Sequence, residues 1–272
     1  MKVQDLINQA SERLDAAGIT NSKLEAQVLL AHVLGKDRSW VIAHAADEVD
    51  AGDFELLLQR RLNQEPLAYI LGHREFYGRR FQVSPAVLIP RHETEVIVEH
   101  CLEVGSAAKS TLDIGTGSGC IAITLALEMP QSLVTGVDIS EKALAVAISN
   151  ADRLEAEVDW KKSDLVSSVQ GQQFDLIVSN PPYIGNHEEL PPDVAGFEPD
   201  SALYAGDDGL SIYKRLAVET KPVLTTRGTL VLEIGDDMEE PVREVFEQAG
   251  WRFANGKRDL DGRMRSLAFR PE

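Results

Sequence analysis

The pattern of apolar positions in the first 65 residues predicts a small bundle of helices. Between Val3 and Leu14, apolar residues recur three or four positions apart, as on the buried face of a helix. Gly18 and Gly35 each follow such a stretch and are expected to end it. The sequence Ser22-Lys23-Leu24-Glu25 matches a capping box, which predicts that Ser22 precedes the second helix and that Glu25 bonds back to it. Helices are predicted over residues 2–17, 22–34, 40–45 and 53–62.

A β-hairpin is predicted after these helices. Phe76 and Phe81 flank the turn-like sequence Tyr77-Gly78-Arg79-Arg80, with strand-like residues on each side. Residues 84–91 contain two prolines and are typical of a linker. We therefore expect two domains: residues 1–84, a helical bundle with a hairpin, and residues 85–272.

From residue 93 onward, helices alternate with short apolar strands. This order is typical of an α/β fold, in which a mainly parallel sheet has helices on both faces. Seven strands are expected, and the last two have no helix between them, so they should pair antiparallel. The strands are predicted at residues 111–114, 133–138, 159–162, 174–179, 229–234, 251–255 and 266–270, and the helices at residues 93–104, 119–128, 140–150, 210–223 and 238–248.

The composition excludes several classes of protein. Hydrophobic residues make up 43% and charged residues 26%, which excludes a disordered chain. The only two cysteines, Cys101 and Cys120, cannot support a disulfide scaffold, and their apolar surroundings predict buried, reduced thiols. No apolar run approaches the ~20 residues of a membrane span, and charges interrupt the N-terminus too often for a signal peptide. These two observations lead us to expect a cytoplasmic protein. The six histidines show no metal-ligand spacing, so we expect no metal site.

The negative charge is concentrated in the second part of the chain. The formal net charge is −17, of which residues 86–272, with 17 Lys and Arg against 32 Asp and Glu, carry −15. Such an acidic body repels phosphate backbones, so stable binding of nucleic acid is not expected.

A glycine-rich turn marks a candidate ligand site. Gly115-Thr116-Gly117-Ser118-Gly119 lies between a predicted strand and a predicted helix. Glycines there let the backbone approach a ligand closely, and the helix N-terminus favours an anionic group. Asp138 ends the next strand, where a carboxylate can accept hydrogen bonds from ribose hydroxyls. Asp164 follows the third strand and is a candidate acceptor for an adenine amino group, or else a loop cap.

The tetrapeptide Asn180-Pro181-Pro182-Tyr183 follows the fourth strand. Ligands of open α/β sheets bind at the carboxyl ends of the strands, so this segment should line the same cleft. The Asn180 side-chain oxygen and the Pro181 carbonyl can both accept a hydrogen bond, which suits a substrate –NH₂ group with two donors. Tyr183 offers a flat face to a planar amide or base.

Together, these motifs resemble a class I S-adenosyl-L-methionine-dependent methyltransferase that acts on a planar nitrogen. The resemblance implies a Rossmann-like methyltransferase sheet in which Asn180 and Pro181 orient the nitrogen. Similar tetrapeptides occur in methyltransferases of DNA adenine, RNA guanine and protein glutamine. The acidic body and several further segments distinguish among these classes of methyltransferase. The segments are residues 66–72, 75–78, 88–95, 198–203, 206–210 and 232–235.

These segments resemble the release-factor glutamine methyltransferase (PrmC/HemK) family along nearly the whole chain. The resemblance implies methylation of the side-chain nitrogen of glutamine in the Gly-Gly-Gln motif of peptide-chain release factors, which the helical domain would recognise. A ribosomal-protein glutamine methyltransferase and, less favoured, a nucleic-acid amino-methyltransferase remain alternatives, as does a nucleotide-binding regulatory protein without catalysis.

The resemblance also implies roles for individual residues. Residues 115–119, Asp138 and Asn180 would bind the cofactor. Residues 180–183 would bind the glutamine, with Asn180, Pro181 and Tyr183 as the catalytic group. Leu165 would cover one face of the adenine, in place of the aromatic residue of some members. His92 stands where the family usually has proline. Arg91, Glu93 and Glu95 would help close the cleft, or else charge and cap the start of a helix.

Overall fold

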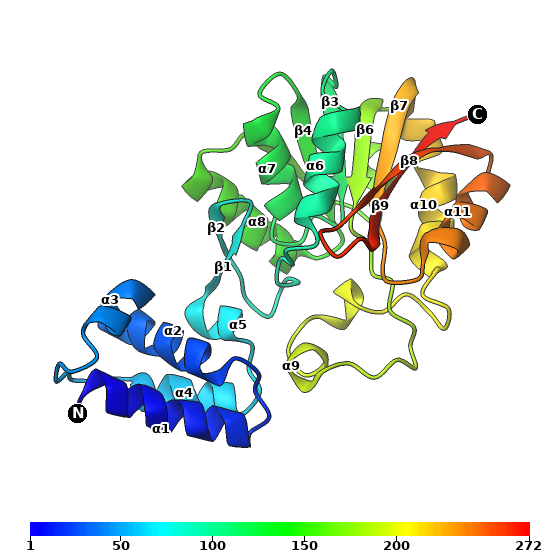
Figure 1. Cartoon of the computed structure of the whole chain (residues 1–272). Helices are drawn as coiled ribbons and strands as arrows, with labels where there is room; N and C mark the ends of the chain where they lie inside the picture. Colours follow the sequence, from blue (N-terminus) through cyan, green and yellow to red (C-terminus); the bar gives the residue numbers. More distant parts are fainter. The chain divides into compact units, whose positions relative to one another are not determined.

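The computed structural model describes residues 1–272 and contains two compact units (Figure 1). The helical unit consists of residues 1–73 together with residues 190–197. The sheet unit consists of residues 74–189 and 198–272. The expected boundary after residue 84 therefore differs from this division, since the hairpin groups with the sheet from residue 74 onward. A short segment from the second half of the chain joins the helical unit, which the sequence did not indicate.

The helical unit is the predicted bundle. Its core contains the apolar faces of the first two helices, including Ile7, Leu14, Leu29 and Leu30, with Leu58 from the fourth. The helices are α1 (Val3–Ala16), α2 (Ser22–Leu34), α3 (Arg38–Ala43), α4 (Phe54–Leu62), α5 (Leu67–Leu71) and the single turn α9 (Pro192–Ala195).

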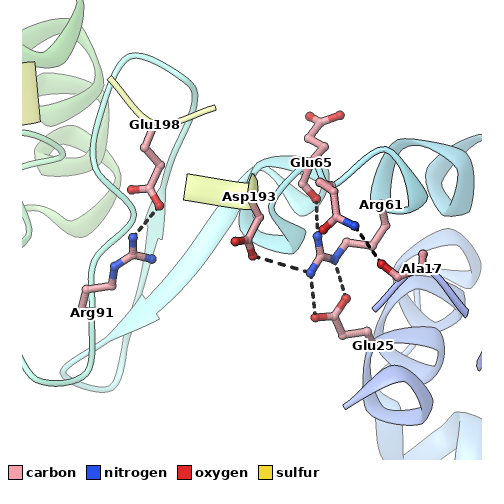
Figure 2. Close-up of polar contacts among 8 residues, drawn as sticks. Ala17, Glu25, Arg61, Glu65, Arg91, Asp193 and Glu198 are labelled. Atoms are coloured by element: carbon pink, nitrogen blue, oxygen red, sulfur yellow. Dashed lines mark hydrogen bonds and ion pairs between the residues drawn. The ribbon is translucent and has the colours of Figure 1, made fainter. Parts of the chain in front are cut away.

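The predicted capping box at the start of α2 is wrong. Ser22 is the first helical residue, and its hydroxyl lies 3.0 Å from that of Ser11. Glu25 instead accepts a hydrogen bond from Arg61 Nε at 2.6 Å, as Figure 2 shows. The Arg61 side chain is only 6% exposed, and a guanidinium at such a position requires a counter-charge. The tertiary ion pair therefore takes the carboxylate that a local cap would have used.

The sheet unit contains the predicted seven-stranded sheet. The strand order is β5-β4-β3-β6-β7-β9-β8, and all neighbours pair parallel except that β9 is antiparallel to both β7 and β8. The predicted antiparallel pairing of the last two strands is thus confirmed. The sheet strands are β3 (Ser110–Ile114), β4 (Leu133–Asp138), β5 (Val158–Lys162), β6 (Phe174–Ser179), β7 (Leu224–Glu233), β8 (Trp251–Arg258) and β9 (Met264–Pro271), and the hairpin is β1 (His73–Phe76) with β2 (Arg79–Gln82).

Helices cover both faces of the sheet, because the buried strands are apolar on both sides. Leu176 and Val178 of β6 pack in one cluster with α6 and α7, whereas Ile177 packs in the opposite cluster with α10 and α11. The helix expected over residues 210–223 is shorter, since Pro222 cannot donate to a continuing helix and a 3-10 turn follows. The helices are α6 (Glu95–Val104), α7 (Cys120–Glu128), α8 (Glu141–Leu154), α10 (Ser211–Glu219) and α11 (Glu239–Gln248), with 3-10 turns at Ser167–Val169, Asp200–Ala202 and Lys221–Val223.

Both cysteines are free and buried in this unit. No helix of the chain combines the length and apolar composition needed to cross a lipid bilayer.

A carboxyl group lies inside the core at the end of β3. Asp113 is fully buried, and its Oδ2 accepts hydrogen bonds from Thr116 Oγ1 at 2.6 Å and from the Ala122 backbone N–H at 3.2 Å. Its Oδ1 has no hydrogen-bond partner. Burial raises the pKa of Asp113 to about 7, because the charged form loses its hydration. Asp113 thus links the loop after β3 to the start of α7. The free-energy cost of burying its carboxyl group increases as the group ionises with rising pH.

We expect Asp113→Asn to become more stable relative to the wild type as the pH rises. The pKa of Asp113 is about 7 in the folded chain and ~4 in the unfolded chain, so its favourable contribution to folding is complete below pH ~4 and is lost between pH ~4 and ~7. Asparagine keeps the acceptor oxygen and does not titrate. Urea unfolding of both proteins at pH 5, 6, 7 and 8, without added ligand, measures the difference. A difference that stays constant over this range would contradict a raised pKa.

Candidate active site

The glycine loop after β3 has an unusual backbone conformation. Gly117 and Gly119 both have positive φ, 55° and 79°. A Cβ at Gly119 would lie only 3.0–3.1 Å from the side chains of Ile123, Ala147 and Trp160, so only glycine lets α7 begin here. The Gly115 and Thr116 N–H groups donate to the carbonyl of Val137 in β4. The loop is therefore held against the end of the neighbouring strand.

Asp138, at the end of β4, is fixed by the backbone on both sides. Its Oδ2 accepts from the Gly117 N–H at 2.9 Å and its Oδ1 from the Ser140 N–H at 2.8 Å. Burial raises the pKa of this carboxyl, and the backbone donors act in the opposite direction. Each oxygen keeps a lone pair for a further donor. The carboxylate is thus oriented before any ligand arrives.

The segment after β5 also reaches the site. Asp164 Oδ1 lies 2.9 Å from Arg215 Nη1, so this carboxylate pairs with a cation from α10 that sequence reasoning missed. Arg215 also pairs with Glu219 one helical turn further on. Leu165 has a φ of 47°, an uncommon conformation for a residue with a side chain, and it packs against the core.

Three of the four residues of the tetrapeptide after β6 line a cavity, which also contains Asp138 and Asp164. Ser179 Oγ donates to the carbonyl of Ile114 at 2.8 Å, which ties the end of β6 to the end of β3. Asn180 Nδ2 donates to Thr94 Oγ1 at 3.3 Å, and Asn180, Pro181 and Pro182 line the cavity. With Nδ2 engaged, Oδ1 is the amide atom available to accept from a ligand.

Tyr183 takes a different position, against β7 and the residues that follow it. A Cβ at Gly235 would lie 2.8 Å from Tyr183 Cδ2, so the glycine makes room for the ring. Burial, followed by the Glu233 charge, raises the pKa of Tyr183 to about 12. Its hydroxyl therefore keeps its proton at neutral pH.

Two buried residues next to Asn180 received no role from the sequence. Thr94 holds the amide, as described, and Glu233 at the end of β7 is buried nearby with its Oε2 unpaired. Burial raises the pKa of Glu233 to about 7, while Thr94, Arg265 and Asn180 oppose this shift. Only the tertiary structure brings these groups beside Asn180.

The residues expected to close the cleft make contacts within the sheet unit. Arg91 Nη2 donates to Glu198 Oε1 at 2.5 Å (Figure 2). Glu95 Oε1 accepts from the Tyr77 backbone N–H at 2.9 Å and lies 3.6 Å from His92 Nδ1.

A cavity of the sheet unit lies at the carboxyl ends of β3, β4, β5 and β6. Its volume is about 270 Å³. It brings together every predicted cofactor residue except Gly119, which faces the helix side of the loop. Its lining includes Ala86, Val87, Leu88, Pro90, Thr94, Gly115, Thr116, Gly117, Ser118, Asp138, Ile139, Ser140, Asp164, Leu165, Asn180, Pro181, Pro182, Pro199, Ser201, Ala202 and Arg215.

Comparison with known proteins agrees with this arrangement. Residues 5–72 match the family model "PrmC N-terminal domain", and residues 92–194 match "Methyltransferase small domain". A release factor glutamine methyltransferase from Koribacter versatilis is 44% identical over 90% of this chain and 91% of its own length. A bifunctional methyltransferase from Rickettsia felis is 37% identical over 99% of this chain, which spans only 58% of that protein.

Among solved structures, a methyltransferase from Pyrococcus furiosus has a TM-score of 0.53 at 20% identity, covering 78% of this chain and 95% of that one. This likeness shows the fold alone. The sequence relatives go further, because one of them aligns over nearly its entire length at high identity. The chain belongs to the release factor glutamine methyltransferase family, and it is an S-adenosyl-L-methionine-dependent methyltransferase.

Proposed function

We propose that this enzyme transfers a methyl group from S-adenosyl-L-methionine to the side-chain nitrogen, N5, of the glutamine in the Gly-Gly-Gln motif of peptide-chain release factors. The observation that carries the proposal is the Asn180 amide at the cavity wall, with Nδ2 held by Thr94 and Oδ1 left to accept. The names of the sequence relatives support the choice of substrate. The reaction takes place in the cytoplasm, where release factors act.

The residues around the glycine loop fit the cofactor. Ser118 lines the cavity, and its Oγ is buried without a hydrogen-bond partner, so a polar group of a ligand would satisfy a buried atom there. Residues 115–118, which line the cavity, would hold the methionine part, and Asp138 the ribose hydroxyls. Leu165 would cover the adenine. Asp164 would accept from the adenine amino group with the oxygen that Arg215 does not occupy.

The cofactor supplies an electrophilic methyl group on a sulfonium. The chain's own contribution is to orient a poor nucleophile, since the lone pair of an amide nitrogen is conjugated with its carbonyl. Asn180 Oδ1 and the Pro181 carbonyl accept the two N–H groups, which aims the lone pair and favours the positive charge that develops on nitrogen. With the cofactor bound, its methyl group would pass to the oriented nitrogen and leave the sulfur as a neutral thioether, and the nitrogen would release one proton to water.

The proposal includes no stable nucleic-acid partner. The net charge of −17 repels phosphate backbones. The proposed protein substrate needs no such attraction.

The substrate is tested by methyl transfer from labelled S-adenosyl-L-methionine to a purified release factor. We expect label on the wild-type factor and none on a factor with Gln→Ala in its Gly-Gly-Gln motif, because the variant lacks the accepting nitrogen. A ribosomal protein and a structured RNA serve as alternative substrates in the same assay. Label on either of these, with none on the release factor, would overturn the proposed substrate.

Asn180→Ala should lower kcat about 100-fold or more and leave the Kd of the cofactor within about twofold, because the substrate amide loses an acceptor that orients it. Steady-state kinetics and isothermal titration calorimetry measure the two quantities. Asn186→Ala is the matched control, since the Asn186 side chain bonds only to the exposed Asp207. A wild-type kcat in Asn180→Ala would refute the assigned role.

Asp138→Asn should raise the Kd of the cofactor at least about tenfold. Both carboxylate oxygens accept from backbone N–H groups, so the amide –NH₂ of asparagine must face a donor, and the preformed acceptor site is lost. Calorimetric titration of both proteins measures the change. Asp159→Asn, on the neighbouring strand β5 with an exposed side chain, is the control. An unchanged Kd in Asp138→Asn would exclude the ribose contact.

A further inference from the structure

Two segments far apart in the sequence form part of the cavity wall. Residues 86–90 contribute Ala86, Val87, Leu88 and Pro90 to the lining, and residues 199–202 contribute Pro199, Ser201 and Ala202. Neither segment belongs to a strand or an α-helix. No ladder of backbone hydrogen bonds therefore fixes them to the sheet, and their position depends on individual contacts.

Glu198 connects the two segments. Its Oε2 accepts from the backbone N–H of Ile89 at 3.0 Å, and its Oε1 accepts from Arg91 Nη2 at 2.5 Å. The side chain is 1% exposed, whereas that of Arg91 is 38% exposed, so the carboxylate is the buried member of the pair (Figure 2). Hydrogen bonds to a buried carboxylate are among the stronger ones, because the acceptor is charged.

The second segment is also held at its other end, by the residue that follows Tyr183. The Ile184 N–H donates to the Leu203 carbonyl at 3.0 Å, and the Ala205 N–H donates to the Ile184 carbonyl at 2.9 Å. Residues 198–205 are thus held at Glu198 on one side and next to Tyr183 on the other. The contacts of Glu198 are the ones that join this stretch to residues 89–91.

We propose that Glu198 is a positioning residue, which holds both segments of the cavity wall in place. It thereby sets the affinity and the residence time of S-adenosyl-L-methionine and of S-adenosyl-L-homocysteine, the product that remains after methyl transfer. This inference rests on the proposed function of the cavity as the cofactor site. Glu198 is not among the lining residues, so it acts through Ile89 and Arg91.

Glu198→Gln tests the proposal with little change of shape. Both carboxylate oxygens accept from donors, so the –NH₂ of glutamine must turn toward either the Ile89 N–H or the Arg91 guanidinium and lose that bond. We expect the Kd of both cofactor forms to rise about tenfold, with kcat at saturating cofactor within about threefold of the wild type. Glu198→Asp keeps the charge but is shorter, and its Kd should lie in between.

Three measurements separate positioning from general destabilisation. Calorimetry gives the Kd, stopped-flow displacement gives the dissociation rate of S-adenosyl-L-homocysteine, and hydrogen exchange reports directly on the Ile89 amide, which should exchange faster in Glu198→Gln. Asp193→Asn is the matched control. It removes an acidic side chain five residues earlier, one that lies 3.8 Å from Arg61 in the helical unit, and it should bind both cofactor forms like the wild type.

The outcomes distinguish the two proposals. A wild-type protein that does not bind the cofactor would overturn the function proposed for the cavity, and this inference with it. A wild-type protein that binds, together with Glu198→Gln and Glu198→Asp variants of unchanged Kd and dissociation rate, would overturn the role of Glu198 alone. A rise in Kd for Asp193→Asn equal to that for Glu198→Gln would also overturn it, since the effect would not depend on the Ile89 and Arg91 contacts.

Discussion

The parallel register of β3 with β4 and β6 is the constraint on which the site depends. Ile114 pairs with Val137 on one side and with Ser179 on the other, so three strands end at the same level. The next residues of each strand are therefore the glycine loop, Asp138 and Asn180. Parallel strands are joined by long connections. The functional segments therefore lie together at the carboxyl ends of the strands although they are far apart along the chain.

Local hydrogen bonds then refine what the register brings together. The Gly117 N–H orients Asp138, Thr94 orients the Asn180 amide, and Ser179 joins the ends of β3 and β6. None of these contacts is between two charged groups. The buried carboxyl groups nearby, Asp113 and Glu233, have pKa values raised to about 7 by burial. The polar groups at the carboxyl ends of the strands are thus held in fixed orientations, and they lie near buried carboxyl groups whose ionisation is unfavourable.

Much of this could be predicted from the sequence, because buried parallel strands are continuous apolar runs followed directly by Gly, Asp or Asn. What the sequence could not show are partners that are distant along the chain. Glu25 pairs with Arg61, 36 residues away, and a local capping motif gave no sign of it. Thr94, at the N-cap of α6, and Arg215, in the middle of α10, reach the site in the same way, and the patterns of both segments indicate only ordinary helices. The positions of the strands were predictable from local composition, whereas these contacts between residues far apart in the sequence were not.

The inclusion of residues 190–197 in the helical unit has a consequence for the order in which the two units fold during synthesis. This unit contains residues 1–73, yet Asp193, which lies 3.8 Å from Arg61, is synthesised only after nearly half of the chain has followed Arg61. During synthesis from the N-terminus, the bundle of α1 to α5 can form early, with Glu25 as the first partner of Arg61. Its last turn, α9, leaves the ribosome only after β3 to β6. The helical unit therefore begins folding first, but its last segment is made after β3 to β6 and before β7 to β9, so the periods in which the two units fold overlap.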